Sequence, residues 1–252
     1  MILEEKKEYI LGMLDNKRIL RTKELSKELN CTEASIRNII NDLAKKKLLK
    51  RVHGGVMKEE QTIIDLPESI TRTLNIEKKE YIANIARNFI EDNSTIIFNA
   101  GSTNFIIANK LNNIKNLNVI TNSIKIANLL SQNTNINVIM LGGVVRAYSY
   151  ATVNYSEENN VKNFKANKLF LDIAAVSLEN GLTEPSIQEA RVEKDMIGIA
   201  DEVIILADST KFDKVALSIV APLNVVNKII TDQEIDKQFV EKIKQMNIEI
   251  YY

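Results

Sequence analysis

The chain has 252 residues, 45% of them apolar, which is enough for a small domain beside a larger one with its own buried core. It contains one cysteine, Cys31, and one histidine, His53, and these counts exclude an internal disulfide and a metal site built from several cysteines or histidines. No run of about 18 apolar residues is present, and the first residues are too charged for a signal peptide. We therefore expect a cytoplasmic protein without a membrane partner, metal or cofactor.

The net charge of zero hides an asymmetry between the two ends of the chain. Residues 1–58 have 14 basic and 8 acidic residues, a net charge of +6, whereas the remainder has 19 and 25, a net charge of −6. A basic segment beside an acidic one indicates a polyanionic partner for the first part only. A solvated lysine-rich surface explains the charge equally well, so charge alone does not decide.

Three short helices are predicted at the start of the chain, over residues 4–14, over 22–30 and from Thr32 onward. Thr32 is a typical helix cap, and Ile36, Ile39, Ile40 and Leu43 follow it at helical spacing. A β-like segment over 48–52 comes next. Two helices joined by a tight turn and followed by a β segment predict a winged helix-turn-helix domain over residues 1–57.

The third helix carries polar side chains on the face opposite its apolar one. Amides and arginines there can contact base edges, and hydroxyls at the helix start can hold a phosphate. Basic residues continue into the predicted wing. We predict that DNA binds to Thr32, Ser35, Arg37, Asn38, Asn41, Lys50, Arg51, His53 and Gly54. The alternative is an ordinary three-helix module that binds another protein.

After a polar connector over residues 58–75, the pattern changes to alternating strands and helices. Such alternation predicts an α/β domain over 76–252 with a mostly parallel sheet covered on both faces. The expected helices are near 77–92, 103–113, 123–132, 154–164, 186–200 and 233–246. The expected strands are 95–99, 117–121, 136–141, 168–176, 202–207, 228–231 and 248–251.

Residues 99–103 join the first of these strands to a helix through the sequence Asn-Ala-Gly-Ser-Thr. A glycine turn before a helix start, where free N–H groups and the helix dipole attract anions, is typical of a phosphate cradle. A simple helix cap explains this segment alone equally well.

Polar or glycine-rich turns also follow the other predicted strands, including the segment 180–183. Because parallel sheets bind ligands beyond the carboxyl ends of their strands, these turns predict one crevice. The predicted ligand contacts are Asn99, Gly101, Ser102, Thr103, Thr121, Asn122, Gly142, Gly143, Glu189, Asp208 and Lys211. Hydroxyls, amides and a lysine suit a sugar phosphate. A local ion pair between Asp208 and Lys211 is the alternative for those two residues.

Several motifs resemble the DeoR family of bacterial regulators, and together they span almost the whole chain. They are Leu25–Leu29, Ser35–Arg37, Leu48–Val56, Val119–Ser123, Leu141–Gly143, Asn180–Thr183 and Leu206–Phe212, with Arg72 and Lys79 between them. The resemblance implies that His53 is a wing residue near the DNA backbone. It also implies a Rossmann-like effector domain similar to ribose-5-phosphate isomerase, which binds a sugar phosphate that loosens DNA binding.

The chain departs from the family pattern in both parts. The glycine usual after Leu-Gly-Gly is missing between Arg146 and Thr152. Arg37–Asn38–Ile39 stands where the family usually has Arg-Arg-Asp, so the operator sequence cannot be transferred from relatives. Asp172 replaces a small residue or glycine, and Ala174–Ala175 replaces an Asn-Gly-like pair. These changes concern the identity of the ligand.

We expect a homo-oligomer, a dimer or tetramer, because one short recognition helix contacts too few bases alone. The expected function is repression of sugar-metabolism genes, relieved by a phosphorylated sugar. One alternative is a sugar-phosphate isomerase-like enzyme with Asp172, Asp208 or Glu189 as its base. A DNA-binding scaffold without a ligand is the other.

Overall fold

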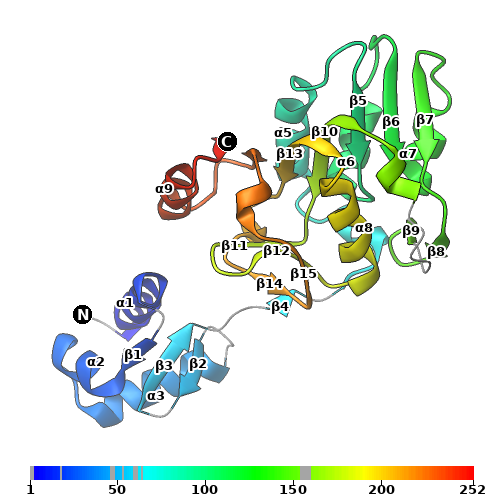
Figure 1. Ribbon diagram of the computed structural model, residues 1–252. Helices are drawn as coiled ribbons and strands as arrows, with labels where there is room; N and C mark the ends of the chain where they lie inside the picture. Colours follow the sequence, from blue (N-terminus) through cyan, green and yellow to red (C-terminus); the bar gives the residue numbers. More distant parts are fainter. Residues whose placement is uncertain are drawn as a thin grey trace. The chain divides into compact units, whose positions relative to one another are not determined.

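The computed structural model describes residues 3–17, 19–45, 49–52, 54–58, 62–63, 65–153 and 160–252. The contacts divide the chain into two compact units, Met1–Gln61 and Thr62–Tyr252. Figure 1 shows both units, coloured along the sequence. No helix in the described ranges is long and apolar enough to cross a membrane.

The first unit consists of three helices and a three-stranded antiparallel sheet in the order β1-β3-β2 (Figure 1). The elements are α1 (Leu3–Asn16), β1 (Ile19–Arg21), α2 (Thr22–Glu28), α3 (Glu33–Lys45), β2 (Leu49–Val52) and β3 (Gly55–Lys58). The three helices and β2 are where the sequence predicts them. The sequence pattern did not predict β1 or β3, whose three or four residues are too few to show an alternation.

The apolar face of α3 explains how this small unit holds together. Ile36, Ile39, Ile40 and Leu43 are buried, and they pack with residues of α1, α2 and the sheet. Strand β3 also comes very close to β1. A Cβ added at Gly55 would lie 2.2 Å from the carbonyl oxygen of Leu20, so only glycine fits there.

The second unit is built on a seven-stranded sheet in the order β17-β16-β13-β10-β5-β6-β7, and every neighbouring pair is parallel. Its strands are β5 (Thr95–Phe98), β6 (Leu117–Thr121), β7 (Ile136–Met140), β10 (Ala166–Asp172), β13 (Ala200–Leu206), β16 (Lys228–Ile230) and β17 (Glu249–Tyr251). The predicted α/β class and parallel sheet are thus confirmed.

Helices cover both faces of this sheet, as the unbroken apolar strands require. They are α5 (Ile76–Arg87), α6 (Ser102–Asn109), α7 (Ile124–Leu130), α8 (Ile187–Ile197) and α9 (Lys237–Gln245). The short helix α4 (Glu68–Thr71) precedes them and has no buried residue. Ile96 and Phe98 of β5 pack in one cluster with α5, α6 and α7. Ile97, which points to the opposite face, packs in the other cluster with α8 and α9.

The prediction for the fourth strand is wrong at its end. A single strand was expected over 168–176, but β10 stops at Asp172 and a separate strand, β11 (Ala175–Ser177), begins three residues later. Segment 180–183 was expected to be a turn, but most of it lies in β12 (Gly181–Glu184). β11, β12 and β15 (Ser218–Ala221) form an antiparallel sheet.

Shorter elements complete the unit. Two small pairs are β8 (Val144–Arg146) with β9 (Ala151–Val153), and β4 (Thr62–Ile63) with β14 (Val215–Ala216). The 3₁₀ turns are η1 (Asn160–Asn163), η2 (Ser209–Lys211) and η3 (Leu223–Val225). The helix expected near 154–164 falls partly outside the described residues, and 160–163 form a 3₁₀ turn instead.

Candidate DNA-binding surface and effector site

The recognition helix α3 exposes the side chains that the sequence analysis assigned to DNA. Ser35, Arg37 and Asn38 are exposed on the face opposite the buried isoleucines, and Asn41 is half-buried beside them. A helix with an exposed polar face of this kind can lie in the major groove of DNA.

The start of α3 is capped by Thr32, as predicted. Its Oγ1 accepts a hydrogen bond from the backbone N–H of Ser35 at 3.2 Å, and the two hydroxyl oxygens are 2.9 Å apart. Both hydroxyls remain exposed, so they can also contact a phosphate.

The wing is the hairpin of β2 and β3, and it is tied to the recognition helix. Arg51 donates to Oδ1 of Asn41 at 2.7 Å, and Arg37 pairs with Glu33 at 3.1 Å within α3. Lys50 and Gly54 are exposed on the hairpin. The predicted DNA contact His53 lies outside the described residues.

In the second unit, Asp172 lies at the centre of the carboxyl edge of the sheet. Its Oδ2 accepts a hydrogen bond from the backbone N–H of Thr103, the second residue of α6, at 2.8 Å. Its Oδ1 accepts from Nζ of Lys211 at 2.7 Å. Burial opposes ionisation, but Lys211, Lys79 and these hydrogen bonds hold the pKa of Asp172 below its usual value. Asp172 therefore stays ionised.

The side chain of Asn99, which follows β5, joins β10, α8 and α6 through hydrogen bonds. Its Nδ2 donates to the carbonyl oxygen of Asp172 at 2.9 Å and to Oε1 of Glu193 at 2.7 Å. Its Oδ1 accepts from Nδ2 of Asn104 at 2.8 Å and from the backbone N–H of Asp172 at 2.9 Å. Every hydrogen-bonding position of this amide is therefore occupied within the protein.

Lys79 and Asp208 flank the Asp172–Lys211 pair. Lys79 is buried and donates to the carbonyl oxygen of Thr71. Burial lowers the pKa of Lys79, and Lys211 adds to this effect against the opposing attraction of Asp172. Burial would also lower the pKa of Lys211, but Asp172 and Asp208 keep it raised. Two cations and two carboxylates thus share this corner of the unit.

A second group of carboxyls lies nearby, formed by Glu184, Glu189 and Glu193. Oε1 of Glu184 accepts from the backbone N–H of Ala174 at 2.7 Å. Burial and the neighbouring Glu189 raise the pKa of Glu184 to about 8. Burial, followed by Glu184 and Glu189, also raises the pKa of Glu193 well above its usual value. With a pKa of about 8, the Glu184 carboxyl is mostly protonated near neutral pH, and a protonated carboxyl can donate a hydrogen bond.

Glu189 itself faces the β8–β9 pair. It accepts a hydrogen bond from Ser149 and pairs with Arg146 at 3.4 Å. Burial raises the pKa of Glu189, although Ser149 and Arg146 oppose this. Arg146 also pairs with Asp65, so it links α8 to the segment that precedes the sheet.

The remaining predicted contacts differ in their surroundings. Oγ1 of Thr121 accepts from the backbone N–H of Ser123 at 3.0 Å, and Oδ1 of Asn122 accepts from that of Ala100 at 2.9 Å. Both residues therefore shape turns. Ser102, at the start of α6, is half-buried and makes no side-chain hydrogen bond to any described residue. Gly142 and Gly143 are exposed in the turn after β7, and no hydrogen bond given for the described residues joins them to the Asp172 corner.

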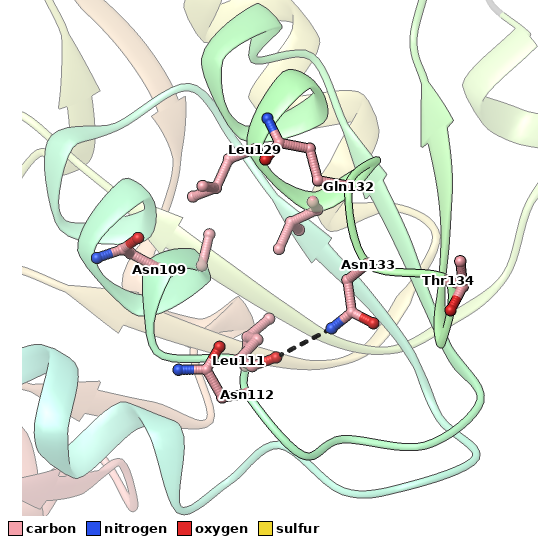
Figure 2. A pocket seen from close by; sticks show the side chains of 9 residues that line it. Asn109, Leu111, Asn112, Leu129, Gln132, Asn133 and Thr134 are labelled. Atoms are coloured by element: carbon pink, nitrogen blue, oxygen red, sulfur yellow. Dashed lines mark hydrogen bonds between the residues drawn. The ribbon is translucent and has the colours of Figure 1, made fainter.

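A pocket of about 410 Å³ lies elsewhere, between the carboxyl ends of α6 and α7 (Figure 2). Asn133 donates to the carbonyl oxygen of Leu111 across it at 3.5 Å. The pocket is lined by Ala108, Asn109, Leu111, Asn112, Leu129, Leu130, Gln132, Asn133 and Thr134. Helices that follow parallel strands run back along the sheet, so this pocket is at the amino edge of the strands. None of the predicted ligand contacts lines it.

Residues 65–75, here called the approach segment, make several hydrogen bonds and ion pairs with the carboxyl edge. Asp65 pairs with Arg146, and Glu68 pairs with Lys125. The carbonyl oxygen of Thr71 accepts from Lys79, and Asn75 donates to Asp208 at 3.4 Å. In the sequence, this segment leads from the first unit to the sheet.

The two units match two parts of one protein family. Residues 7–62 match the DeoR-like helix-turn-helix domain, and residues 74–233 match the DeoR C-terminal sensor domain. The chain belongs to the DeoR family of transcription regulators. The first unit is therefore its DNA-binding domain and the second its sensor.

Full-length relatives support the assignment of this regulator. It is 30% identical to the HTH-type transcriptional regulator IolR of Bacillus subtilis over 100% of this chain and 98% of that protein. It is 29% identical to the regulator GolR of Listeria innocua, with 98% and 97% covered. The repressor CsqR of Escherichia coli is 26% identical, with 96% and 92% covered.

Among solved structures, ribose 5-phosphate isomerase A from Methanocaldococcus jannaschii matches the regulator with 18% sequence identity and a TM-score of 0.40. The match covers 55% of each chain.

Sequence reasoning did not identify three residues of the sensor's edge. Glu184 was hidden because its strand was taken for a turn. Asn104, which ties Asn99 to the carbonyl oxygen of Phe170, appears in the sequence only as one polar residue in an apolar helix. Glu193 follows Glu189 by one helical turn, and that spacing is the only signal that could have revealed it.

Proposed function

We propose that this regulator is a repressor of sugar-metabolism genes that acts in the cytoplasm, and that a phosphorylated sugar at the carboxyl edge of the sensor sheet releases it from operator DNA. The main support for this proposal comes from the contacts of the approach segment. This segment leads to the DNA-binding domain in sequence, and it is tied to Arg146, Lys125, Lys79 and Asp208 around that edge. A ligand that binds these groups unequally in two states shifts the population between them.

Within this site we assign different roles to the predicted contacts. Ser102, the start of α6 and Lys211 would bind the phosphate, because a helix start and an ammonium group both favour an anion. Asp208 and Glu189 would contact sugar hydroxyls. Asn99, Thr121 and Asn122 would hold the loops in place, because their side chains already bond within the protein.

In this proposal the protein acts as a homo-oligomer, a dimer or tetramer. The exposed face of α3 spans few base pairs, and paired half-sites supply the missing specificity. The ligand would misalign paired DNA-binding domains, which lowers affinity for the operator without touching the recognition helix.

The test is a titration of the purified protein with its own upstream DNA, at several salt concentrations, with and without a panel of sugar phosphates. We expect specific binding that weakens steeply with salt and is released by at least one sugar phosphate. Ser102→Ala should keep the DNA affinity but need more effector for release, whereas Ser131→Ala, at the end of α7, should match the wild type. Binding no tighter than to random DNA would overturn the proposal.

An isomerase-like enzyme is the competing function, and the raised pKa of Glu184, about 8, is the observation in its favour. A carboxyl group that titrates near neutral pH is suited to moving a proton between adjacent carbons. We propose binding without turnover. Conversion of ribose 5-phosphate that disappears in Glu184→Gln or Asp208→Ala would instead establish the enzyme.

A further inference from the structure

The carboxylate of Asp172 lies at the start of α6, where an anionic ligand would bind. The Asp172 carboxylate accepts the backbone N–H of Thr103 through one oxygen and the Lys211 ammonium through the other, at 2.8 Å and 2.7 Å. A free N–H at a helix start and a nearby ammonium are the two donors that a phosphate oxygen would take. In this structure both donors bind Asp172.

The shape of the turn supports the same conclusion. A Cβ added at Gly101 would lie 2.3 Å from Cβ and 2.5 Å from Oδ2 of Asp172. The carboxylate therefore fills the space that the glycine leaves open in front of the helix. A phosphate cannot enter this space while Asp172 remains in it.

The charges around the turn are balanced only because of Asp172. Lys79 and Lys211 are matched by Asp172 and Asp208, and all four interact with one another or with a shared neighbour. Without the Asp172 carboxylate, two ammonium groups would face a single carboxylate. The corner would then have a net positive charge beside a free backbone N–H, which is a built anion site.

We infer that Asp172 determines the anion specificity of the effector site: its carboxylate takes the place of the effector's phosphate, which binds there only after Asp172 has left Thr103 and Lys211. Free phosphate makes no further contacts, so it competes poorly. A sugar phosphate competes because its hydroxyls add contacts to the carboxyls and amides around it. This inference rests on the proposed function in one respect, the identity of the effector as a phosphorylated sugar.

The experiment measures binding of inorganic phosphate to the full-length protein by isothermal titration calorimetry at constant ionic strength. We expect Asp172→Ala to bind phosphate at least tenfold more tightly than the wild type. Asp201→Ala removes the same charge at the amino end of β13, where the side chain is exposed, and should bind phosphate as weakly as the wild type. In Asp172→Ala, phosphate should also shift the amide resonance of Thr103.

Equal phosphate affinity in the wild type and Asp172→Ala would overturn the inference, as would a gain in affinity without any shift at Thr103. If Asp172→Ala does not fold, Asp172→Asn decides the question, because it keeps the shape and an oxygen for Thr103 but loses the charge. At least a threefold gain in phosphate affinity is expected for Asp172→Asn, and no gain would overturn the inference.

The outcome is independent of the repressor test. Tighter phosphate binding by Asp172→Ala, with no sugar phosphate acting on the DNA complex, would support the role of Asp172 and reject the proposed function. Release of DNA by a sugar phosphate, with Asp172→Ala unchanged in phosphate affinity, would do the reverse.

Discussion

The DNA-binding surface and the carboxyl edge of the sensor present their polar side chains in opposite ways. On α3 and the wing, Arg37, Asn38 and Lys50 are exposed, and the arginine has only a surface pair with Glu33. At the sensor edge, Asn99 and Asp172 are buried and bonded within the protein. In the proposed function, DNA would therefore bind the first surface as it stands, whereas a ligand at the second would first have to break internal contacts.

This difference has an energetic consequence. Exposed ion pairs contribute about 0–1 kcal/mol, so DNA phosphates can replace the partner of Arg37 with little loss. Asp172 is buried and Lys211 half-buried. Leaving one member of a buried pair without a partner costs about 3–5 kcal/mol, and this is an upper bound for the Asp172–Lys211 pair. If the proposed effector site is right, a ligand there must therefore replace several contacts at once.

The strongest test of this contrast is Asn99→Ala. It removes four hydrogen bonds, which are those to Glu193, to the side chain of Asn104 and to the backbone N–H and carbonyl groups of Asp172. We expect the free energy of unfolding of the sensor to fall by about 3–5 kcal/mol in urea unfolding.

Asn137→Ala is the matched control, since this exposed amide has one hydrogen bond, to Asn118 at 3.0 Å. It should change the stability by less than about 1 kcal/mol. If Asn99→Ala were as stable as the control, Asn99 would be a ligand contact rather than a tie.

The sequence predicted the sensor's framework because its strands are long apolar runs followed by polar turns. It also predicted that Gly101, Thr103, Asp208 and Lys211 lie at one edge of the sheet, because the carboxyl ends of parallel strands meet there. The pairing of Asp172 with Thr103 could not be predicted in this way. That contact depends on where a strand stops. Asp172 is the one polar residue between Leu169 and Val176, and the apolar residues on both sides of it favoured a single continuous strand.

In the DNA-binding unit the sequence predicted the helices but not all of the strands. Apolar residues at helical spacing located α3, and the capping residue Thr32 located its start. Strand β1 has only three residues and packs closely against Gly55. Such tertiary packing cannot be predicted from the local sequence.

The pH dependence of stability provides the next test. The pKa of Glu184 is raised to about 8 in the folded sensor, whereas an unfolded glutamate titrates near 4.5. The neutral carboxyl therefore stabilises the fold fully below about pH 4.5, and this contribution is lost as the pH rises to about 8. We expect stability to fall by on the order of 4 kcal/mol over that range.

Glu184→Gln should flatten this dependence, because the amide stays neutral at every pH. The exposed Glu80→Gln, which pairs with Lys110 on the surface, should leave the curve unchanged. Unfolding midpoints measured from pH 5 to pH 8 compare the three proteins. A curve for Glu184→Gln as steep as that of the wild type would assign the dependence to another group.

A smaller effect is expected on the exposed surface. Arg37→Ala should weaken operator binding by about 1–3 kcal/mol per half-site and reduce its salt dependence, with sensor stability unchanged. Lys17→Ala, which removes an exposed charge outside the predicted contacts, is the control in a fluorescence anisotropy titration. Equal losses in the two variants would show that general charge, and not the face of α3, provides the affinity.

The smallest expected effect concerns the approach segment, where the two regions of the chain meet in sequence. Glu68 pairs with Lys125, whose Nζ also lies 4.2 Å from the ring centroid of Tyr150. Because this pair is partly exposed, Glu68→Gln should lower stability by only about 0.5–1 kcal/mol. It should nevertheless reduce the effector concentration needed to release DNA, because one tie on the segment has been removed. Glu91→Gln breaks a similar pair, with Lys168 at 2.7 Å, at the amino edge of the sheet, and should not change the release. If the two variants released DNA at the same effector concentration, the approach segment would not couple the buried site to the exposed one.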